Sequence, residues 1–309
     1  QLDGHKLVAV GSRETFRARR FADRYGIPAA HAHGSYTALA QDPAVDVVYV
    51  ATPHSEHLEC ALLAIAAGKH VLIEKPLALN ATQARVIAKA AAEAHVTCME
   101  AMWTRFLPHM ARLRTLLDQG IIGPVTALMA DHTQRLPSDP DHRINNLALG
   151  GGALLDLGVY PVSFAYDLFG SPQQIDVSFA ALGPTGADQQ VAGVFNYSGG
   201  TRAFWLAASD FQGPTRACVS GRDGRIELER IWYAPTTLKA WSHDGTLLDS
   251  FDGSTPGRGM QFQAREMERL IVASQLTSQI MPLYQSIEVM EAMDQVRAQI
   301  GVVYPADVA

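Results

Sequence analysis

The sequence has few cysteines and no long apolar run, and these absences exclude several classes of protein. Its 309 residues contain three widely spaced cysteines, Cys60, Cys98 and Cys218. An odd, scattered set provides neither a disulfide framework nor a cysteine zinc site and fits a reducing compartment. No apolar run approaches the roughly 20 residues that span a bilayer, and the first residues form no signal peptide. We therefore expect a cytoplasmic protein without a membrane partner.

Basic charge is also scarce. Lys and Arg together number 25 against 31 Asp and Glu, which gives a formal charge of −6, and no basic run occurs. A nucleic-acid partner is therefore not expected. Hydrophobic residues make up 48% and charged residues 18% of the chain, which is a globular composition. The length suffices for two domains, each with its own core.

Residues 6–103 alternate short apolar runs with helical patterns. Strands are predicted at 7–10, 45–51, 70–73 and 96–99, and helices at 14–25, 55–67 and 82–94, with a helical turn at 36–40. This rhythm predicts right-handed crossovers and a parallel, Rossmann-like sheet. Ligands of such sheets lie beyond the carboxyl ends of the strands. Candidate site residues are therefore expected at those ends.

After residue 104 the pattern changes to strands joined by tight turns. A helix is predicted at 108–120, strands at 125–130, 177–181, 191–197, 201–207, 216–219 and 225–228, and closing helices at 260–273 and 284–300. We therefore predict an α/β dinucleotide-binding domain over residues 1–104. A second domain over residues 105–309, α+β with a large, mostly antiparallel open sheet, is expected to bind substrate and to oligomerise.

Glu74-Lys75-Pro76 ends one of the buried strands and is the strongest local signal. A lysine at the carboxyl end of a parallel strand projects into the ligand crevice. Its ammonium can hydrogen-bond a substrate hydroxyl and stabilise the alkoxide that forms as hydride leaves. The alternative is a strand-terminal ion pair in water, and the functional interpretation is favoured.

Asp156 and Tyr160 stand four residues apart after the triple glycine at 150–152. That spacing places both side chains on one helix face, where a carboxylate and a phenol can orient a diol and pass a proton. The glycines would let the backbone approach a ligand closely. A capped helix start with Tyr160 in the core is the competing interpretation.

Ser12 and Arg13 follow the strand predicted at 7–10, which we interpret as the second strand of a dinucleotide-binding unit. NAD-preferring sites usually carry an acid at this position for the ribose 2′-hydroxyl. A hydroxyl and a guanidinium there would attract a 2′-phosphate. NADP is therefore favoured over NAD, although a solvated surface turn is an equal alternative for these residues alone.

Two further groups of residues remain ambiguous. His54 and His57 suggest a metal, but no third ligand follows at suitable spacing, so no metal is assigned. Trp103, Arg105 and Phe106 are equally compatible with the wall of a ring-sized cleft and with an interdomain core.

Together these segments resemble the glucose-fructose oxidoreductase/inositol dehydrogenase (Gfo/Idh/MocA) family. The resemblance runs through nearly the whole chain, and the similar segments are Val-Ala-Val-Gly-Ser-Arg, Ala-Thr-Pro-His-Ser-Glu-His, Glu-Lys-Pro, Glu-Ala-Met-Trp-Thr-Arg-Phe and Gly-Gly-Gly-Ala-Leu-Leu-Asp-Leu-Gly-Val-Tyr-Pro. The last two look most like the branch of dimeric dihydrodiol dehydrogenases and NADP-dependent D-xylose dehydrogenases. Inositol is a less favoured substrate, because a His commonly stands at position 160 in the inositol dehydrogenases.

The resemblance implies roles for particular residues. Lys75 and Tyr160 would be the catalytic pair, with Asp156 assisting, and Lys75-Pro76 would be a cis peptide. The implied cofactor contacts are Ser12 and Arg13 at the adenosine end and Thr52, His54, His57, Glu74, Lys75, Trp103 and Arg105 toward the nicotinamide. Dimers or tetramers would form through the open face of the second-domain sheet.

One departure from the family pattern concerns its first strand and Gly-x-Gly-x-x-Gly turn, whose amides hold the pyrophosphate. The sequence enters the pattern after that point. We expect a gap in the middle of the parallel sheet, unpaired backbone groups beside it, and weak NADP binding by this polypeptide.

The leading hypothesis is hydride transfer between NADP and a hydroxyl-bearing carbon of a sugar or cyclic trans-diol, such as D-xylose or a dihydrodiol. One alternative is a non-catalytic dinucleotide- or sugar-binding sensor of the same fold. Another is a member that retains its cofactor and performs lyase or glycosidase chemistry, for which Ser12-Arg13 argues weakly the other way.

Overall fold

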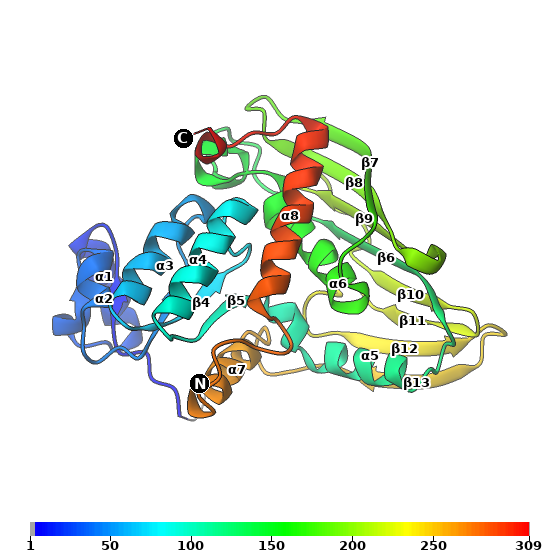
Figure 1. Cartoon of the computed structure of the whole chain (residues 1–309), viewed down its shortest axis with the longest axis horizontal. Helices are drawn as coiled ribbons and strands as arrows, with labels where there is room; N and C mark the ends of the chain where they lie inside the picture. The colour runs from blue at the N-terminus through cyan, green and yellow to red at the C-terminus, as the bar shows by residue number, and fades with distance from the viewer. Residues whose placement is uncertain (1–3, 309) are drawn as a thin grey trace.

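The structure, a computed structural model, describes residues 4–308 and has two layered parts side by side. Figure 1 shows the N-terminal part in blue and cyan beside a broad sheet in green and yellow, with helix α8 (Leu283–Ile300) between them. Helix α8 packs on α4 (Ala81–Glu93) and β5 (Cys98–Ala101) of the first part and on β7 (Gln174–Leu182) of the second. The C-terminal helix therefore fastens the two parts together.

The N-terminal part contains five short parallel strands in two separate sheets. They are β1 (Val10–Gly11) paired with β2 (Ala32–His33), and β3 (Val47–Val50), β4 (His70–Glu74) and β5 (Cys98–Ala101) in that order. Within residues 4–308 no strand lies between β1 and β3, and a cleft of about 860 Å³ separates them. The gap expected in the middle of the parallel sheet is therefore present.

Helices cover these strands as their apolar spacing predicts. They are α1 (Thr15–Tyr25), α2 (Tyr36–Ala40), α3 (His57–Ala66) and α4 (Ala81–Glu93). In α4 the buried side chains Ala81, Ala84, Ile87 and Ala91 recur at helical spacing. The helix begins at Asn80, whose side chain accepts a hydrogen bond from the backbone N–H of Gln83.

The second part is built on one eight-stranded sheet. Its order is β13-β12-β11-β10-β6-β9-β8-β7, and all neighbours are antiparallel except β6 and β9. The strands are β6 (Val125–Thr133), β7 (Gln174–Leu182), β8 (Asp188–Asn196), β9 (Arg202–Ala208), β10 (Ala217–Gly221), β11 (Gly224–Leu228), β12 (Thr237–Ser242) and β13 (Leu247–Asp252).

Helices pack on one face of this sheet and leave the other face open. They are α5 (Pro108–Asp118), α6 (Val159–Phe169) and α8, while α7 (Gln261–Val272) lies beside the segment that joins the two parts. The α/β first part and the open, mostly antiparallel sheet of the second confirm the predicted fold class.

The predicted strands and helices agree with the observed ones except at their ends, but the predicted strand ranges contain no counterpart of β2, β12 or β13. The first strand is shorter than the predicted 7–10, and the strand predicted at 96–99 lies at Cys98–Ala101. The stretch Leu147–Phe169 is long and apolar enough to cross a membrane, although the sequence analysis found no such run. Of its most apolar window 83% is buried inside the protein, which is the pattern of a core helix.

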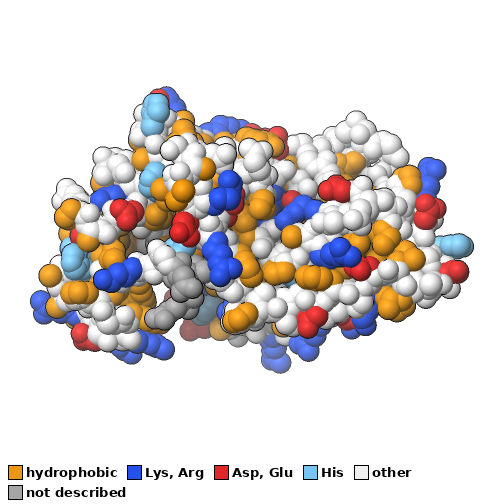
Figure 2. All heavy atoms as spheres, turned by 90° about the horizontal axis from the view of Figure 1, so that it is seen from below, with side chains coloured by type: hydrophobic (Ala, Val, Ile, Leu, Met, Phe, Trp, Pro, Cys, Tyr) orange, Lys and Arg blue, Asp and Glu red, His pale blue; other side chains and the backbone are white. Residues whose placement is uncertain are grey.

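The surface carries no extended region of one charge on the face shown in Figure 2. Basic and acidic side chains are interspersed there among apolar ones. That face therefore has no basic stripe of the kind that binds nucleic acid.

Candidate active site

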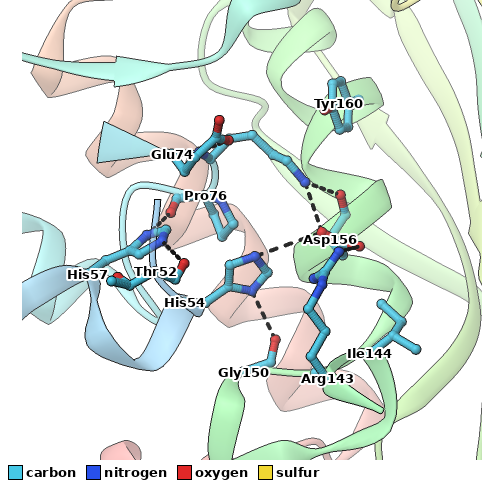
Figure 3. A network of polar contacts seen from close by, with 12 residues as sticks. Thr52, His54, His57, Glu74, Pro76, Arg143, Ile144, Gly150, Asp156 and Tyr160 are labelled. Atoms are coloured by element: carbon cyan, nitrogen blue, oxygen red, sulfur yellow. Dashed lines mark hydrogen bonds and ion pairs between the residues drawn. The ribbon is translucent and has the colours of Figure 1, made fainter. Parts of the chain in front are cut away.

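Lys75 follows directly on β4 and reaches across to the second part of the chain. Its ammonium donates hydrogen bonds to the main-chain oxygen of Asp156 at 2.7 Å and to Asp156 Oδ1 at 2.9 Å. Only 13% of the Lys75 side chain is exposed, and the Lys75-Pro76 peptide bond is cis, as the family resemblance implies. The residue after β4 and the segment that carries Asp156 were predicted from separate motifs, and they are in direct contact (Figure 3).

Asp156 is buried among positively charged and polar groups. Besides Lys75, its carboxylate accepts a hydrogen bond from Arg143 at 3.1 Å, and His54 Nε2 lies 3.8 Å from Oδ1. Burial alone would raise the pKa of Asp156, but the neighbouring charges of Lys75 and Arg143 hold it well below its ordinary value. Burial lowers the pKa of His54 to about 3, so this imidazole is neutral and adds no charge. The carboxylate is therefore ionised at neutral pH.

The same pairing keeps Lys75 protonated. Burial acts to lower the pKa of its ammonium, but Asp156 and Tyr160 outweigh that effect and raise the pKa above its ordinary value. The Lys75 nitrogen also lies 5.0 Å from the centre of the Tyr160 ring. A cation and a phenol therefore stand together at the predicted site.

Tyr160 is buried in an aromatic wall. Its hydroxyl accepts a hydrogen bond from Trp103 Nε1 at 3.0 Å, and its ring centre lies 4.7 Å from His132 and 5.0 Å from Tyr233. Burial raises the pKa of Tyr160 despite the nearby Lys75 ammonium, so the phenol is protonated in the neutral range. His132 in turn stacks on Tyr233 at 3.9 Å between centroids.

Asp156 and Tyr160 do face the same neighbour, but the intervening turn is not α-helical. Residues Leu154–Gly158 form a π-helical segment that continues directly into α6. Such segments occur frequently at functional sites. The backbone of the preceding glycines packs closely on other parts of the protein. A Cβ at Gly150 would meet His54 at 2.9 Å, and one at Gly151 would meet Arg143 O at 2.7 Å.

His54 and His57 lie at the end of β3 as predicted, and both direct ring nitrogens at backbone carbonyls. His54 Nδ1 contacts Gly150 O at 3.1 Å. Both ring nitrogens of His57 contact backbone carbonyls, Pro76 at 2.9 Å and Thr52 at 3.1 Å. His57 therefore has no nitrogen free for the cofactor and instead holds the loop that carries Lys75.

Glu74 sits on the other side of Lys75. It accepts hydrogen bonds from the hydroxyl of Tyr49 and from the backbone N–H of Lys75, the latter at 3.2 Å. Burial, followed by the charge of Glu74, raises the pKa of the Tyr49 phenol.

Arg105 does not line the site, in contrast to its predicted role. Its buried guanidinium donates to Ser163 Oγ at 2.9 Å, Ser163 O at 2.7 Å and Ile280 O at 3.2 Å, and also bonds Gln285. Through these hydrogen bonds the Arg105 guanidinium links α6 to the segment before α8. Of the Trp103–Phe106 turn, Trp103 is the residue that contacts the catalytic candidates, through Tyr160.

Ser12, Arg13 and Thr52 line the cleft between β1 and β3. The Arg13 guanidinium is 68% exposed and forms a 2.9 Å ion pair with Glu56. Thr52 Oγ1 is buried without a hydrogen-bond partner among the described residues. An exposed guanidinium and an unpaired hydroxyl at the strand ends fit the phosphate and ribose groups of a dinucleotide.

Three residues of the site were not predicted from the sequence, namely Arg143, His132 and Tyr233. None lies in a motif with meaningful spacing. Arg143 is in the loop after β6, His132 near the end of β6, and Tyr233 in the segment after β11. Only the packing of the sheet against α6 brings them to Lys75 and Tyr160.

Family models match both parts of the chain. The oxidoreductase family with an NAD-binding Rossmann fold, Gfo/Idh/MocA, matches residues 1–102. The C-terminal domain of the same family matches residues 110–227.

Relatives of known name match along nearly the whole chain. Trans-1,2-dihydrobenzene-1,2-diol dehydrogenase of Danio rerio is 37% identical, over 98% of this chain and 91% of its own length. The protein of the same name from Homo sapiens is 35% identical with the same coverage.

Solved structures share the fold. Aldose-aldose oxidoreductase from Caulobacter crescentus, complexed with glycerol, superposes with a TM-score of 0.85 over 96% of this chain and 90% of its own, at 24% identity. KijD10, a 3-ketoreductase from Actinomadura kijaniata in complex with NADP and TDP-benzene, has a TM-score of 0.82 at 25% identity, covering 95% and 89%. The chain therefore belongs to the Gfo/Idh/MocA oxidoreductase family, and it is an NAD(P)-dependent dehydrogenase that acts on hydroxyl groups.

Proposed function

We propose that the protein transfers hydride between NADP and a hydroxyl-bearing carbon of a cyclic trans-diol or sugar, with Lys75 and Tyr160 as the catalytic pair. The observation that carries this proposal is the position of the Lys75 ammonium. It lies 2.9 Å from the Asp156 carboxylate and 5.0 Å from the Tyr160 ring, where β4 ends.

Lys75 has the chemistry to stabilise charge on the reacting oxygen. A buried ammonium that keeps its proton can donate a hydrogen bond to a substrate hydroxyl and favour the alkoxide as the C–H bond breaks. The nicotinamide, when bound, supplies the hydride acceptor or donor. We place the reacting carbon's oxygen between Lys75 and Tyr160.

Tyr160 would exchange the hydroxyl proton. Its hydroxyl is held by Trp103 Nε1 at 3.0 Å, which fixes the direction of the phenol oxygen and leaves its own O–H free to donate. The phenol is protonated at neutral pH, so it is ready to donate a proton to a carbonyl oxygen during reduction.

Asp156 would act as a positioning residue through Lys75. Its carboxylate is oriented in turn by Arg143 at 3.1 Å, with neutral His54 at 3.8 Å. These contacts hold the ammonium in one place and keep it charged.

NADP is proposed over NAD because of Ser12 and Arg13 at the cleft between β1 and β3. An exposed guanidinium attracts a 2′-phosphate. Glu56 at 2.9 Å competes for the same guanidinium, which limits the preference.

The aromatic wall supports a ring-shaped substrate. Trp103, Tyr160 and Tyr233 meet edge-on or tilted, with centroids 5.0 to 6.4 Å apart. Such faces pack against the apolar face of a cyclohexadiene or a pyranose. The relatives named for trans-1,2-dihydrobenzene-1,2-diol favour a cyclic diol, and D-xylose is the sugar that we propose as the alternative.

We also propose that residues 1–104 form the cofactor-binding domain. Residues 105–309 would bind the substrate and self-associate. The open face of the eight-stranded sheet carries a paired row of Val194, Phe204, Met129 and Cys218. Phe204 and Met129 are 41% and 48% exposed. This apolar row supports a homodimer or homotetramer.

The proposal is tested with Lys75→Met and Tyr160→Phe. Each variant should lower kcat by about 10²–10⁴-fold, because each removes a proton-handling group. NADPH formation or consumption would be followed with dihydrodiols, D-xylose and other aldoses.

Matched controls are Lys69→Met and Tyr197→Phe, which alter a lysine bonded to Asp42 and Val45 carbonyls and a buried tyrosine away from the site. Thermal unfolding would show that all four variants fold. Near-full turnover in Lys75→Met or Tyr160→Phe would refute the catalytic assignment.

A further inference from the structure

Two histidines and an aspartate meet at a second site, away from Lys75. His31 Nδ1 lies 2.6 Å and His33 Nε2 lies 2.8 Å from the same carboxylate oxygen, Asp42 Oδ2. Within residues 4–308 this is the one set of three such side chains whose ligand atoms all lie within 4.8 Å of one another. We call these three residues the His-His-Asp cluster.

The local chain geometry explains why the three side chains converge. His31 is the last residue of the 3-10 helix Ala29–His31 and His33 is the last residue of β2, with the extended residue Ala32 between them. Asp42 comes from the loop between α2 and β3. The cluster therefore joins the edge strand β2 to the connection that leads into β3.

The carboxylate is fixed in orientation by contacts outside the cluster. Asp42 Oδ1 accepts a hydrogen bond from the backbone N–H of Ala44 at 2.9 Å, which leaves Oδ2 for the two imidazoles. The main-chain oxygen of Asp42 accepts another from Lys69 Nζ at 2.9 Å. Such supporting contacts are the kind that orient metal ligands.

Accessibility also suits an exchangeable ion. The Asp42 side chain is only 3% exposed, whereas the side chains of His31 and His33 are 33% and 18% exposed. An ion could therefore reach the carboxylate from the imidazole side, where water is available as a further ligand.

The histidines near Lys75 do not direct two imidazole nitrogens at one carboxylate oxygen. Both ring nitrogens of His57 and one of His54 contact backbone carbonyls. The His-His-Asp cluster has instead two imidazole nitrogens directed at one carboxylate oxygen, at 2.6 and 2.8 Å.

We propose that the His-His-Asp cluster binds one divalent transition-metal ion of the zinc type, through His31 Nδ1, His33 Nε2 and Asp42 Oδ2, with water in the fourth position. Two imidazoles and a carboxylate suit Zn²⁺ and its neighbours rather than Mg²⁺ or Ca²⁺, which prefer all-oxygen sites. Metal–ligand bonds of about 2.0–2.1 Å would set neighbouring ligand atoms about 3.3 Å apart. That spacing requires the imidazoles to withdraw from Asp42 by less than 1 Å, roughly, which small side-chain rotations supply.

A bound ion would bridge β2 and the α2–β3 loop. It would therefore stabilise the fold by binding the folded state alone, in proportion to the logarithm of its concentration. The alternative is a cluster held only by hydrogen bonds and ion pairing, with no affinity for metal.

Chelator-treated protein would be titrated with Zn²⁺ by calorimetry and with Co²⁺ by visible absorption. We expect one ion per chain, Co²⁺ bands typical of tetrahedral coordination that Zn²⁺ abolishes, and a melting temperature that rises with Zn²⁺. His33→Asn and Asp42→Asn should each weaken binding at least tenfold, the range that ligand-environment changes commonly produce.

The double variant His31→Asn/His33→Asn should still fold, because each asparagine can donate a hydrogen bond to Asp42. It should lose the Co²⁺ bands and the Zn²⁺-dependent rise in melting temperature. His95→Asn, at the exposed end of α4, is the matched control and should retain both. Failure of the wild type to bind Zn²⁺, or equal binding by the double variant, would overturn the proposal and leave a hydrogen-bonded cluster.

Discussion

Lys75, Asp156 and Tyr160 show how neighbouring charges decide the state of a single residue. Burial by itself would favour a neutral lysine and a protonated aspartate. Their 2.9 Å contact reverses both tendencies, lowering the pKa of Asp156 and raising that of Lys75. The pair is therefore charged, and the phenol beside it keeps its proton.

These pKa directions predict opposite pH dependences for the two directions of reaction. Reduction needs the proton that Tyr160 and Lys75 carry, so its rate should fall as pH rises into the alkaline range. Oxidation needs a deprotonated acceptor for the hydroxyl proton, so its rate should rise over the same range. Burial raises the pKa of Tyr160 and the charge of Asp156 adds to that rise, so Asp156→Asn should move the rise in oxidation to lower pH.

The measurement is the pH profile of kcat/KM in each direction for wild type and Asp156→Asn. Asp167→Asn, which removes a carboxylate paired with Arg114, is the control and should leave the profile in place. An unchanged profile in Asp156→Asn would show that Asp156 does not influence the titration of Tyr160.

Cofactor preference is also argued at single residues. Arg13→Ala should raise KM for NADP by about tenfold, the effect of losing a charge-assisted hydrogen bond of roughly 1.5 kcal/mol, and should change KM for NAD little. Glu56→Gln releases Arg13 from its 2.9 Å ion pair and should lower KM for NADP. Arg24→Ala, which removes a basic side chain in the last turn of α1 that does not line the cleft, serves as control. Equal changes for NADP and NAD would exclude a 2′-phosphate contact.

At the scale of one element, the π-helical segment Leu154–Gly158 and the glycines before it set the position of Asp156. Gly150 has φ 76° and packs against His54 and Leu79, where a Cβ would come within 2.9 and 2.4 Å. Gly301 at the end of α8 has nearly the same left-handed backbone, φ 74° and ψ 23° against 76° and 36° at Gly150, with nothing within 4 Å of a Cβ.

Comparing alanine substitutions at these two glycines separates the free-energy cost of backbone strain from the cost of close packing. Gly301→Ala should cost about 1–2 kcal/mol of unfolding free energy from the left-handed backbone alone. Gly150→Ala should cost a further 1–3 kcal/mol from overpacking, and should lower kcat as His54 is displaced. Denaturant unfolding and turnover would be measured for both. Equal losses of unfolding free energy in the two variants would show that close packing around Gly150 adds nothing to the cost of a Cβ there.

At the scale of the whole molecule, the eight-stranded sheet presents one covered face and one open face. Helices α5, α6 and α8 cover the first, while the row of Val194, Phe204, Met129 and Cys218 lies on the second. Exposed apolar rows of this kind favour association of identical subunits.

If the row forms the proposed interface, Phe204→Arg should yield monomers, because a charge in the centre of the row would be buried without a partner. Light scattering coupled to gel filtration would give the mass. Phe16→Arg, which changes an exposed phenylalanine of α1, should leave the oligomer intact. A wild-type protein that is monomeric at micromolar concentrations would contradict the proposed interface.

Much of this architecture follows from the sequence by itself. Alternating patterns predicted every helix of the N-terminal part to within two residues of its observed ends, because apolar spacing and caps act locally. The motif Glu-Lys-Pro at a strand end, and the spacing of Asp156 and Tyr160, identified groups that do lie together. Parallel strands share one carboxyl edge, so a pattern along the chain is enough to predict that meeting place.

Other features depended on tertiary structure alone. Arg143, His132 and Tyr233 reach the site from three separate segments, and Arg105 is drawn away from it to Ser163 and Ile280. The His-His-Asp cluster likewise joins residues on either side of α2. Local sequence reports periodicity and backbone preference, whereas side chains from distant segments meet only when sheets and helices pack, and no spacing rule encodes that packing.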